Sequence, residues 1–372
     1  MDPSPPADLP SRAATLSVDL DAIAANYLWF AQRAAPAACA ACVKADAYGL
    51  GLAPVARTLW DTGCREFFVA TAGEGTALRQ LLPRALIYVL NGFLPGEQSL
   101  LRDANLTPVL NAPAQVAAFE AQFPAGTPAA LQLDTGMTRL GLDTRDIDAL
   151  SSRWRRPGAV TLLLSHLACA DEPEHPMNTQ QLARFRAAWQ ALGRPRASLA
   201  NSSGVLLGSE WHFDLVRPGA GLYGLNPRPA DANPLRPVVR LHAPVLQVRS
   251  VASDVSVGYG ATYRTPAPGR IATVACGYAD GYPRAAGNRA HAMLRGRRVP
   301  LIGRLSMDLL TLDVGTLPAD QPSPGDQAEL LGPGHDIDAL ADAAGTIGYE
   351  LLTHLGRLCR RRYHAAEGQQ PE

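Results

Sequence analysis

The sequence predicts an α/β fold in two parts, a (β/α)₈ TIM barrel followed by a mostly β domain. Eight short apolar runs alternate with stretches long enough for helices, a pattern typical of parallel strands joined by right-handed crossovers. These units fill about two hundred residues, which suits this barrel. Beyond Pro237, strand-like runs are joined by Gly and Pro turns, without helical spacers until about residue 336. That part should pair mostly antiparallel.

The elements follow in order. Residues 14–20 read as a strand, and Asp19 can cap a helix with apolar residues at helical spacing. Good helix formers fill 114–122 and 179–192. The eight barrel runs are 38–43, 66–72, 85–91, 107–111, 129–134, 159–166, 197–202 and 213–219. The strand-like runs of the second part are 238–251, 270–276, 291–303, 309–314 and 328–332.

We expect a disordered leader at 1–11, the barrel at 12–236 and the mostly β domain at 237–372. The Pro-rich start lacks the basic residues and apolar core of a signal peptide, and no apolar run approaches the ~18 residues of a membrane span. We therefore expect a cytoplasmic protein. Lys+Arg and Asp+Glu are both 34, so no overall charge favours nucleic acid or a membrane surface. The partner should be a small molecule.

Cysteine and histidine patterns give no sign of a metal or redox site. Cys39 and Cys42 form a C-x-x-C pair inside an apolar run, and no second such pair exists. Buried strand cysteines are the favoured interpretation. The eight histidines lack H-E-x-x-H spacing, so no metal is expected.

Polar residues fall at the carboxyl ends of the predicted barrel strands, where this fold places its chemistry. Each has an ordinary structural explanation alone, such as a surface lysine, an ion-paired arginine or a packed histidine. Five strand ends with ligand-type residues favour a site. Lys44 is a candidate for an imine with a carbonyl cofactor, and Ser202 with the Gly219 amide suits a phosphate. The set is Lys44, Arg139, His166, Asn201, Ser202, Arg217 and Gly219.

Three glycine-rich segments stand out in the second domain: 258–263, 277–282 and 303–308. Tyrosine normally titrates near ~10, so Tyr259 would need help to act as a base. From spacing alone, glycine-turned hairpins with packed tyrosines are the favoured interpretation.

Taken together, nine motifs in order resemble the alanine racemase family of pyridoxal-phosphate enzymes, from about Ala14 to Tyr363. They are VKADAYGLG, LDTGMTRLG, LSHLACADEP, ANSSG, DLVRPGAGLYG, VGYGATY, CGYADGYPR, IGRLSMD and TIGYELLT. The resemblance implies interconversion of L- and D-alanine with pyridoxal phosphate, D-alanine for peptidoglycan, and a homodimer in which Tyr259 and Met307 enter the partner's site.

The resemblance also implies a role for each matching residue. Lys44 would hold the cofactor and serve as one base, with Tyr259 as the other. Arg217 would face the pyridine nitrogen, and His166 would pack against the ring and support Tyr259. Arg139 would lie near the cofactor oxygen and the substrate carboxylate, which the Met307 backbone would also bind. Phosphate would be shared by Tyr48, Ser202, Gly219, Ala220 and Tyr349, and the entry lined by Tyr278, Arg284 and Asp308.

These roles fit the chemistry of racemisation, which removes the α-proton from one face and returns a proton to the other. Two bases on opposite faces are therefore needed, and the cofactor ring supplies the electron sink. A guanidinium at the ring nitrogen has no ready proton to give. We expect the ring to remain a weaker sink and side-transamination to be suppressed. Unchanged transamination in Arg217→Glu would contradict this view.

Two positions depart from the family pattern. Gln132 stands where many relatives carry a lysine, often carbamylated, that supports the DTGM arginine; it can bond Arg139 but brings no negative charge. Ser198 stands where a histidine often supports the pyridine arginine. Its hydroxyl is shorter, so water or another group would have to complete the surroundings of Arg217.

Three alternatives stay open. A broader racemase acting on serine or other small amino acids is kept in view by Gln132, and relative rates on alanine, serine and lysine would separate it from the first interpretation. A decarboxylase of similar architecture agrees less well with VGYGATY and DTGMTRLG. A non-catalytic pyridoxal-phosphate-binding protein would lack the second domain.

Overall fold

The computed structural model describes residues 13–143, 145–149 and 160–365. These residues form two compact units. The barrel unit consists of Ile23–Ala47 and Leu52–Arg236, and the β unit of 13–22, Tyr48–Gly51 and 237–365.

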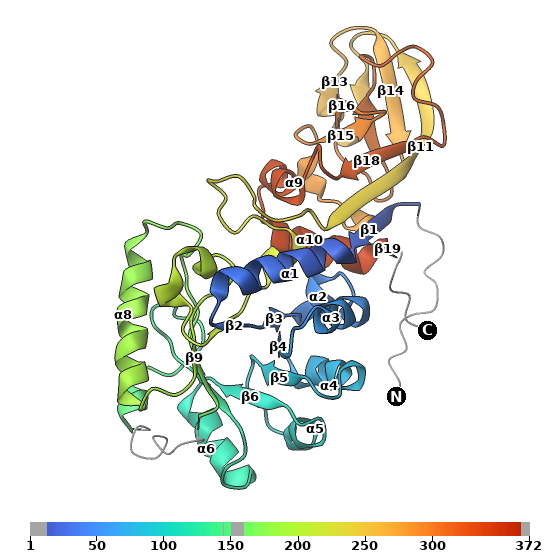
Figure 1. The fold of residues 1–372 in the computed structure, drawn as a ribbon. Helices are drawn as coiled ribbons and strands as arrows, with labels where there is room; N and C mark the ends of the chain where they lie inside the picture. The colour runs from blue at the N-terminus through green and yellow to red at the C-terminus, as the bar shows by residue number, and fades with distance from the viewer. Residues whose placement is uncertain (1–12, 144, 150–159, 366–372) are drawn as a thin grey trace. The chain divides into compact units, whose positions relative to one another are not determined.

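The barrel unit is built on a parallel sheet in the order β3-β4-β5-β6-β7-β8-β9. The strands are β2 (Ala38–Cys39), β3 (Ala41–Cys42), β4 (Glu66–Val69), β5 (Leu86–Val89), β6 (Thr107–Leu110), β7 (Ala130–Gln132), β8 (Leu162–Leu164), β9 (Ala197–Ser198) and β10 (Leu215–Val216). The helices are α1 (Leu20–Ala34), α2 (Lys44–Tyr48), α3 (Leu52–Asp61), α4 (Ala72–Leu81), α5 (Gln98–Asp103), α6 (Pro113–Gln122) and α8 (Pro176–Ala191). Figure 1 shows α3, α4 and α5 ranged along the outside of the strands.

The ring of strands closes through β10. This strand pairs in parallel with β2, which shares the segment 38–42 with β3. On its other side, the Arg217 amide donates to the Ala200 carbonyl just beyond β9. Every one of the eight predicted runs contains strand residues, and the predicted (β/α)₈ barrel is confirmed.

Strand residues of the barrel are buried on both faces, which is why they read as continuous apolar runs rather than alternating ones. Phe67, Ile87 and Leu163 are fully buried. Both members of the C-x-x-C pair lie in strands as free thiols, and burial raises the pKa of Cys39 well above its usual range. A thiol held protonated in this way is a poor nucleophile.

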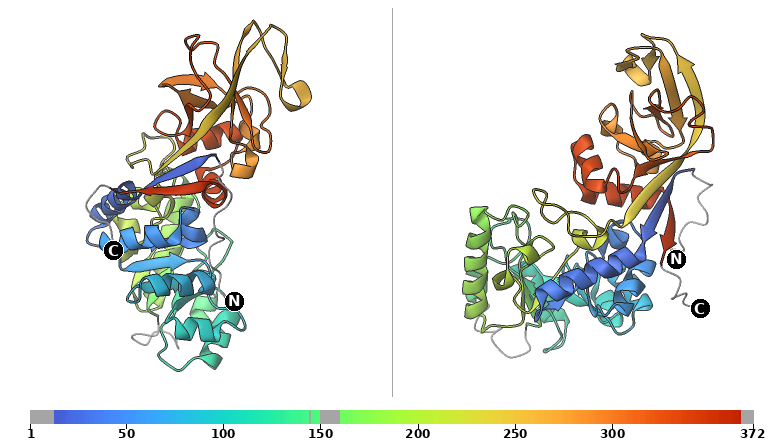
Figure 2. Two further views of the ribbon diagram at one scale, coloured as in Figure 1. Left: turned by 90° about the vertical axis from the view of Figure 1, so that its right-hand side faces the viewer. Right: turned by 45° about the horizontal axis from the view of Figure 1, so that its top comes forward.

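The β unit is organised around β11 (Val239–Val251), seen as the long strand in Figure 2. It pairs antiparallel with β1 (Thr15–Asp19), β14 (Gly269–Val274) and β18 (Gln327–Leu331). The remaining elements are β12 (Ser256–Val257), β13 (Tyr263–Arg264), β15 (His291–Leu294), β16 (Arg297–Pro300), β17 (Leu310–Asp313), β19 (Arg360–His364), α9 (Ile337–Ala344) and α10 (Gly348–Leu358). A mostly β second part, largely antiparallel, is confirmed.

Among the described residues, no helix combines the length and apolar character needed to cross a membrane.

Candidate active site

Lys44 begins α2, directly after the first barrel strand, on an unusual turn. Residues 45–48 all have positive φ, between 54° and 57°, so this turn is left-handed. For L-residues this conformation costs ~1–2 kcal/mol each. Polar contacts offset the cost: the Ala45 amide donates to Glu74 Oε1 at 2.8 Å, and the Leu52 amide to Asp46 Oδ1 at 2.6 Å. The turn therefore holds half-buried Lys44 at a defined place on the barrel mouth.

Lys44 is also the only lysine in the chain. Of the 34 basic Lys and Arg residues, the other 33 are arginine. Arginine can replace lysine as a surface cation, but its guanidinium stays charged and forms no imine. A single lysine at a strand end of a barrel is therefore a specific signal of amine chemistry, and residue counting alone could have found it.

His166 follows β8 and lies among three cations. Burial and, after it, the positive charges of Arg217, Arg139 and Lys44 together lower the pKa of His166 to about 3. The four side chains, predicted from separate strand ends, are thus close enough to interact electrostatically. At neutral pH the imidazole is uncharged, so it can donate or accept a hydrogen bond without adding a fourth positive charge.

Within the described residues, Arg217 donates hydrogen bonds only to uncharged acceptors. Its Nη1 donates to Ser198 Oγ at 2.5 Å and its Nη2 to the Ser165 carbonyl at 2.6 Å. The side chain is 6% exposed, and burial lowers its pKa to about 10. Ser198 therefore reaches Arg217 itself, and the Ser165 carbonyl is the other group that completes its surroundings. Ser198 pairs with Leu164 on the neighbouring strand, which brings hydroxyl and carbonyl to the same guanidinium.

The direction of each hydroxyl in this cluster follows from proton counting. Ser198 Oγ has one proton and places it on the Leu215 carbonyl at 2.5 Å, so its lone pairs face Arg217. Ser165 Oγ likewise donates to the Leu133 carbonyl at 2.8 Å. Because that proton is used, the bond between Thr135 and Ser165, 2.8 Å long, must be donated by Thr135.

Gln181 of α8 connects this cluster to His166. Its Nε2 donates to Thr135 Oγ1 at 3.1 Å and to the His166 carbonyl at 2.9 Å, and its Oε1 accepts from the Ala168 amide. Gln181 is fully buried. Sequence reasoning missed Gln181 and Thr135, since an amide inside a helix gives no local signal of what it faces.

Arg139 lies on an exposed loop that returns to β7. The Leu142 amide donates to the Gln132 carbonyl, and the Gln132 side chain donates to the Leu140 carbonyl at 3.0 Å. Gln132 thus fixes the loop backbone, and no hydrogen bond from it to Arg139 is found in the described part of the chain. Gln132, which could have hydrogen-bonded Arg139, instead bonds the carbonyl of the adjacent residue Leu140.

The turn after β10 presents backbone amides to Ser202. The Gly219 and Gly221 amides both point to Ser202 Oγ, at 3.0 and 3.2 Å, and Ala220 begins the short helix η3 (Ala220–Tyr223). A Cβ on Gly221 would lie 2.5 Å from Cζ of Phe30, so only glycine fits. Convergent amides beside a hydroxyl suit an anion. Asn201, expected in the same site, caps the following turn by accepting from the Gly204 amide.

Two predicted phosphate ligands lie together in the β unit. The rings of Tyr48 and Tyr349 have centroids 6.3 Å apart. Tyr48 is buried, and Tyr349 is 45% exposed.

Tyr259 is held out from the β unit on the short helix η4 (Tyr259–Ala261) with 69% of its surface exposed. The backbone around it is tightly cradled. A Cβ on Gly258 would lie 3.2 Å from the backbone N and O of Arg304, and one on Gly260 3.1 Å from the Arg304 guanidinium. Both glycines have φ of 72°, which favours glycine. The exposed Tyr259 therefore projects from a backbone turn that has little room to move.

Met307 and Tyr278 share a second cradle in the β unit. The Ala279 amide donates to the Met307 carbonyl at 2.9 Å, and a Cβ on Gly277 would lie 2.2 Å from the same oxygen. Met307 is 55% and Tyr278 41% exposed. Arg284 and Asp308 are exposed as well. The β unit thus brings the residues of the predicted entry to its surface.

Comparison with known proteins decides the family. Residues 18–227 match the model described as "Alanine racemase, N-terminal domain", and 238–363 match "Alanine racemase, C-terminal domain". The chain belongs to the alanine racemase family. It is 52% identical over 357 residues to the alanine racemase of Rhodospirillum rubrum, covering 94% of this chain and 96% of that one.

Solved structures of family members are similar throughout. The biosynthetic alanine racemase of Pseudomonas aeruginosa is 40% identical, with a TM-score of 0.90 over 95% of this chain and 100% of that one. The alanine racemase of Bartonella henselae, with covalently bound pyridoxal phosphate, is 37% identical, with a TM-score of 0.89 over the same shares.

Proposed function

We propose that the protein interconverts L- and D-alanine with pyridoxal phosphate as cofactor, an isomerase reaction of the family. The observation that carries the proposal is the chain's one lysine, fixed at the barrel mouth beside neutral His166 and neutrally held Arg217. An amine, a guanidinium and an anion-binding turn on one barrel suit a phosphorylated pyridine aldehyde.

The residues present fit that cofactor. Lys44 would hold it covalently, Arg217 would donate to its ring nitrogen, and the Gly219 and Ala220 amides with Ser202 would bind its phosphate. Tyr48 and Tyr349 would complete the phosphate ligands. When bound, the cofactor ring supplies the electron sink for loss of the α-proton.

Proton transfer falls to two side chains of this protein. Lys44 Nζ serves one face of the substrate, and Tyr259 Oη serves the other. His166, uncharged at neutral pH, would support the tyrosine by accepting a hydrogen bond at its unprotonated ring nitrogen. The Lys44 and Tyr259 roles exchange when the reaction runs in reverse, so each residue must be able to hold and release a proton.

Substrate orientation is assigned to Arg139 and Met307. The Arg139 guanidinium would bind the substrate carboxylate, and the Met307 backbone would share it. Tyr278, Arg284 and Asp308 would line the approach. The exposure of Met307 and Tyr278 supports this assignment.

We further propose a homodimer in which the partner subunit's Tyr259 and the partner subunit's Met307 complete each site. Support comes from the exposure of Tyr259 and Met307 on rigid glycine-cradled turns, since large exposed apolar side chains on ordered backbone mark contact surfaces. Mixing Lys44→Ala with Tyr259→Phe protein should restore activity if sites are shared, because one hybrid site then holds both wild-type residues. Absence of any restoration after subunit exchange would contradict a shared site.

The proposed physiological setting is the cytoplasm, with D-alanine supplied to peptidoglycan. A broader amino-acid racemase stays the second candidate, since Gln132 brings no charge to the Arg139 loop. The deciding experiment is chiral analysis after incubation with pyridoxal phosphate and L-alanine, then L-serine and L-lysine. Racemisation of alanine far above the others supports the proposal, and racemisation of none contradicts it.

A further inference from the structure

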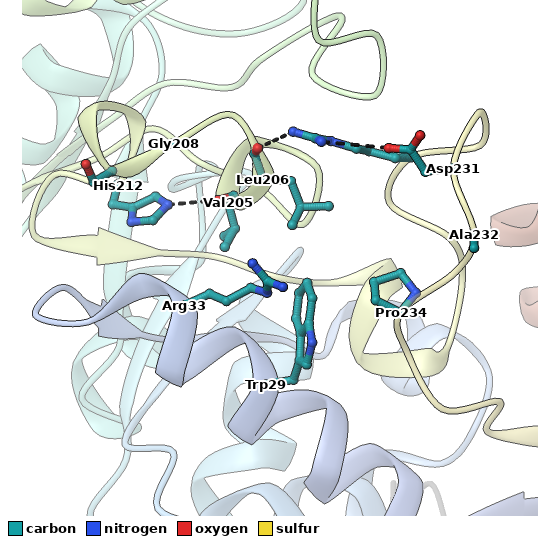
Figure 3. Close-up of a pocket in the computed structure, with 11 residues that line it drawn as sticks. Trp29, Arg33, Val205, Leu206, Gly208, His212, Asp231, Ala232 and Pro234 are labelled. Atoms are coloured by element: carbon teal, nitrogen blue, oxygen red, sulfur yellow. Dashed lines mark hydrogen bonds and ion pairs between the residues drawn. The ribbon is translucent and has the colours of Figure 1, made fainter.

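The barrel unit contains a cavity of about 500 Å³ outside the site described above (Figure 3). Three separate segments form its walls: the last turns of α1, residues 205–212 after the Ser202 turn, and residues 228–234. Lys44, His166 and Arg217 are not among its lining residues. This volume is in the range of small-molecule sites.

The charged groups of the cavity leave an excess of positive charge. Two guanidiniums, of Arg33 and Arg228, line it with one carboxylate, of Asp231. Asp231 Oδ2 is 3.8 Å from Arg228 Nη1, while Arg228 Nη2 donates to the Leu206 carbonyl. Both terminal nitrogens of Arg228 are therefore engaged by the protein, although its Nε has no partner among the described residues, and the exposed Arg33 adds a second positive charge.

Arg33 stacks on a tryptophan ring, as Arg65 does, but differs from it in hydrogen bonding. Its guanidinium lies over the Trp29 ring at 4.2 Å, as does that of Arg65 over Trp60. Arg65 also donates to the Trp60 and Cys64 carbonyls, at 2.6 and 2.9 Å. For Arg33, no hydrogen bond or ion pair is found within the described residues. The indole occupies the face of its guanidinium and leaves the N–H edge for an acceptor.

The remaining walls combine apolar and polar side chains. Figure 3 shows Trp29 and Arg33 rising from α1 toward Val205 and Leu206, with Pro234 at one side. His212 faces the cavity, with its Nε2 against the Val205 carbonyl at 3.0 Å. A ligand here would meet the cationic edge of Arg33 and the apolar side chains of Leu206 and Pro234.

We propose that this cavity binds a small aromatic carboxylate, with its carboxylate on the Arg33 edge and its ring against Leu206 and Pro234. Two carboxylate oxygens match the parallel N–H groups of a guanidinium, which a spherical anion does not exploit. An apolar ring removes the surfaces of Leu206 and Pro234 from water. The site is independent of the proposed racemase chemistry.

Ligand-detected NMR titration of the holoenzyme with benzoate tests the site. Saturating racemic alanine is present, so that a carboxylate cannot enter the substrate's place. We expect one benzoate site per chain. Acetate and benzyl alcohol should bind at least tenfold more weakly, because acetate lacks the ring and benzyl alcohol lacks the carboxylate. Arg33→Gln should weaken benzoate at least fivefold, and Arg65→Gln should leave it unchanged.

Several results would overturn the proposal: no benzoate binding under these conditions, equal binding by benzyl alcohol, or equal losses in the two arginine variants. Racemisation by each variant is measured separately. Because Arg33 contacts none of the proposed catalytic residues, wild-type turnover with lost benzoate binding is the expected pattern.

Discussion

The barrel mouth and the exposed face of the β unit position the side chains of the proposed site in opposite ways. At the barrel mouth, Arg217 is 6% exposed and every hydroxyl around it has a determined direction. On the β unit, Tyr259 is 69% exposed, and the precision lies in the backbone beneath it. Buried groups are fixed by hydrogen bonds that must be satisfied, whereas an exposed group needs a turn that cannot move.

The difference indicates which part of the site one chain can complete. Two proposed cofactor ligands, Ser202 and the Ser198-supported Arg217, are ordered by contacts within the barrel unit. Tyr259, Met307 and Tyr278 stand on fixed turns but are uncovered within their own unit, so we expect a partner to cover them.

The largest expected effect is at the barrel mouth. Lys44→Ala should lower racemisation roughly 10³-fold or more, because covalent attachment and one base are lost together. Borohydride reduction of the holoenzyme followed by peptide mapping should place the cofactor on Lys44 in wild type and on no side chain in the variant. A cofactor retained elsewhere in Lys44→Ala would contradict the assignment.

The exposed face should respond differently. Tyr259→Phe should reduce turnover roughly 10²-fold or more by removing one proton carrier, while the absorbance of bound cofactor stays unchanged. Solvent deuterium entry into L-alanine and D-alanine, measured separately, should fall unequally for the two enantiomers. Equal rates in Tyr259→Phe and wild type would remove Tyr259 from the mechanism. Tyr363→Phe, an exposed tyrosine of β19, is the control.

A smaller effect is expected from the neutral support of Arg217. Ser198→Ala removes a hydrogen bond to a charged group, worth ~1.5–3 kcal/mol, so cofactor affinity should fall roughly tenfold or more. Apoenzyme reconstitution followed by fluorescence gives the dissociation constant. Ser198→Thr keeps the hydroxyl and should restore most of the affinity, whereas a loss of stability alone would not be rescued by it. Cofactor affinity unchanged in Ser198→Ala would show that the Ser165 carbonyl suffices.

The last effect is on stability rather than activity and concerns resistance to acid in the β unit. His335 is 3% exposed, and neither ring nitrogen has a hydrogen-bond partner among the described residues. Burial, with smaller contributions from His291 and Arg298 and against the opposing charge of Asp336, lowers its pKa to about 4. Between about pH 6.5 and pH 4, His335 is protonated in the unfolded chain but not in the folded one. The free energy of unfolding should therefore fall as pH falls, by on the order of 3 kcal/mol.

Denaturant titrations from pH 7.5 to 4 measure this loss. His335→Leu should remove part of the pH dependence, while the exposed His364→Gln should not. A parallel loss of stability in wild type and His335→Leu over the whole range would contradict the role of His335.

The eight barrel strands were predictable because strands buried on both faces leave continuous apolar runs. The pairing of β1 was not, since its partner residues in β11 lie more than two hundred positions away. The reach of Ser198 and the actual partner of Gln132 depend on strand register and loop closure, which residue type does not encode. The uniqueness of Lys44 was visible in the sequence and needed only counting.

The left-handed turn after Lys44 also separates that residue from the motions of α3. A helix lengthens or frays cooperatively only within one hand, because each new hydrogen bond continues the same coil. Residues 45–48 wind one way and α3 the other, with Gly49 and Gly51 at positive φ between them. We therefore expect fraying of α3 to stop where the backbone changes from right-handed to left-handed. The Lys44 amine should then keep its position when the first turn of α3 opens.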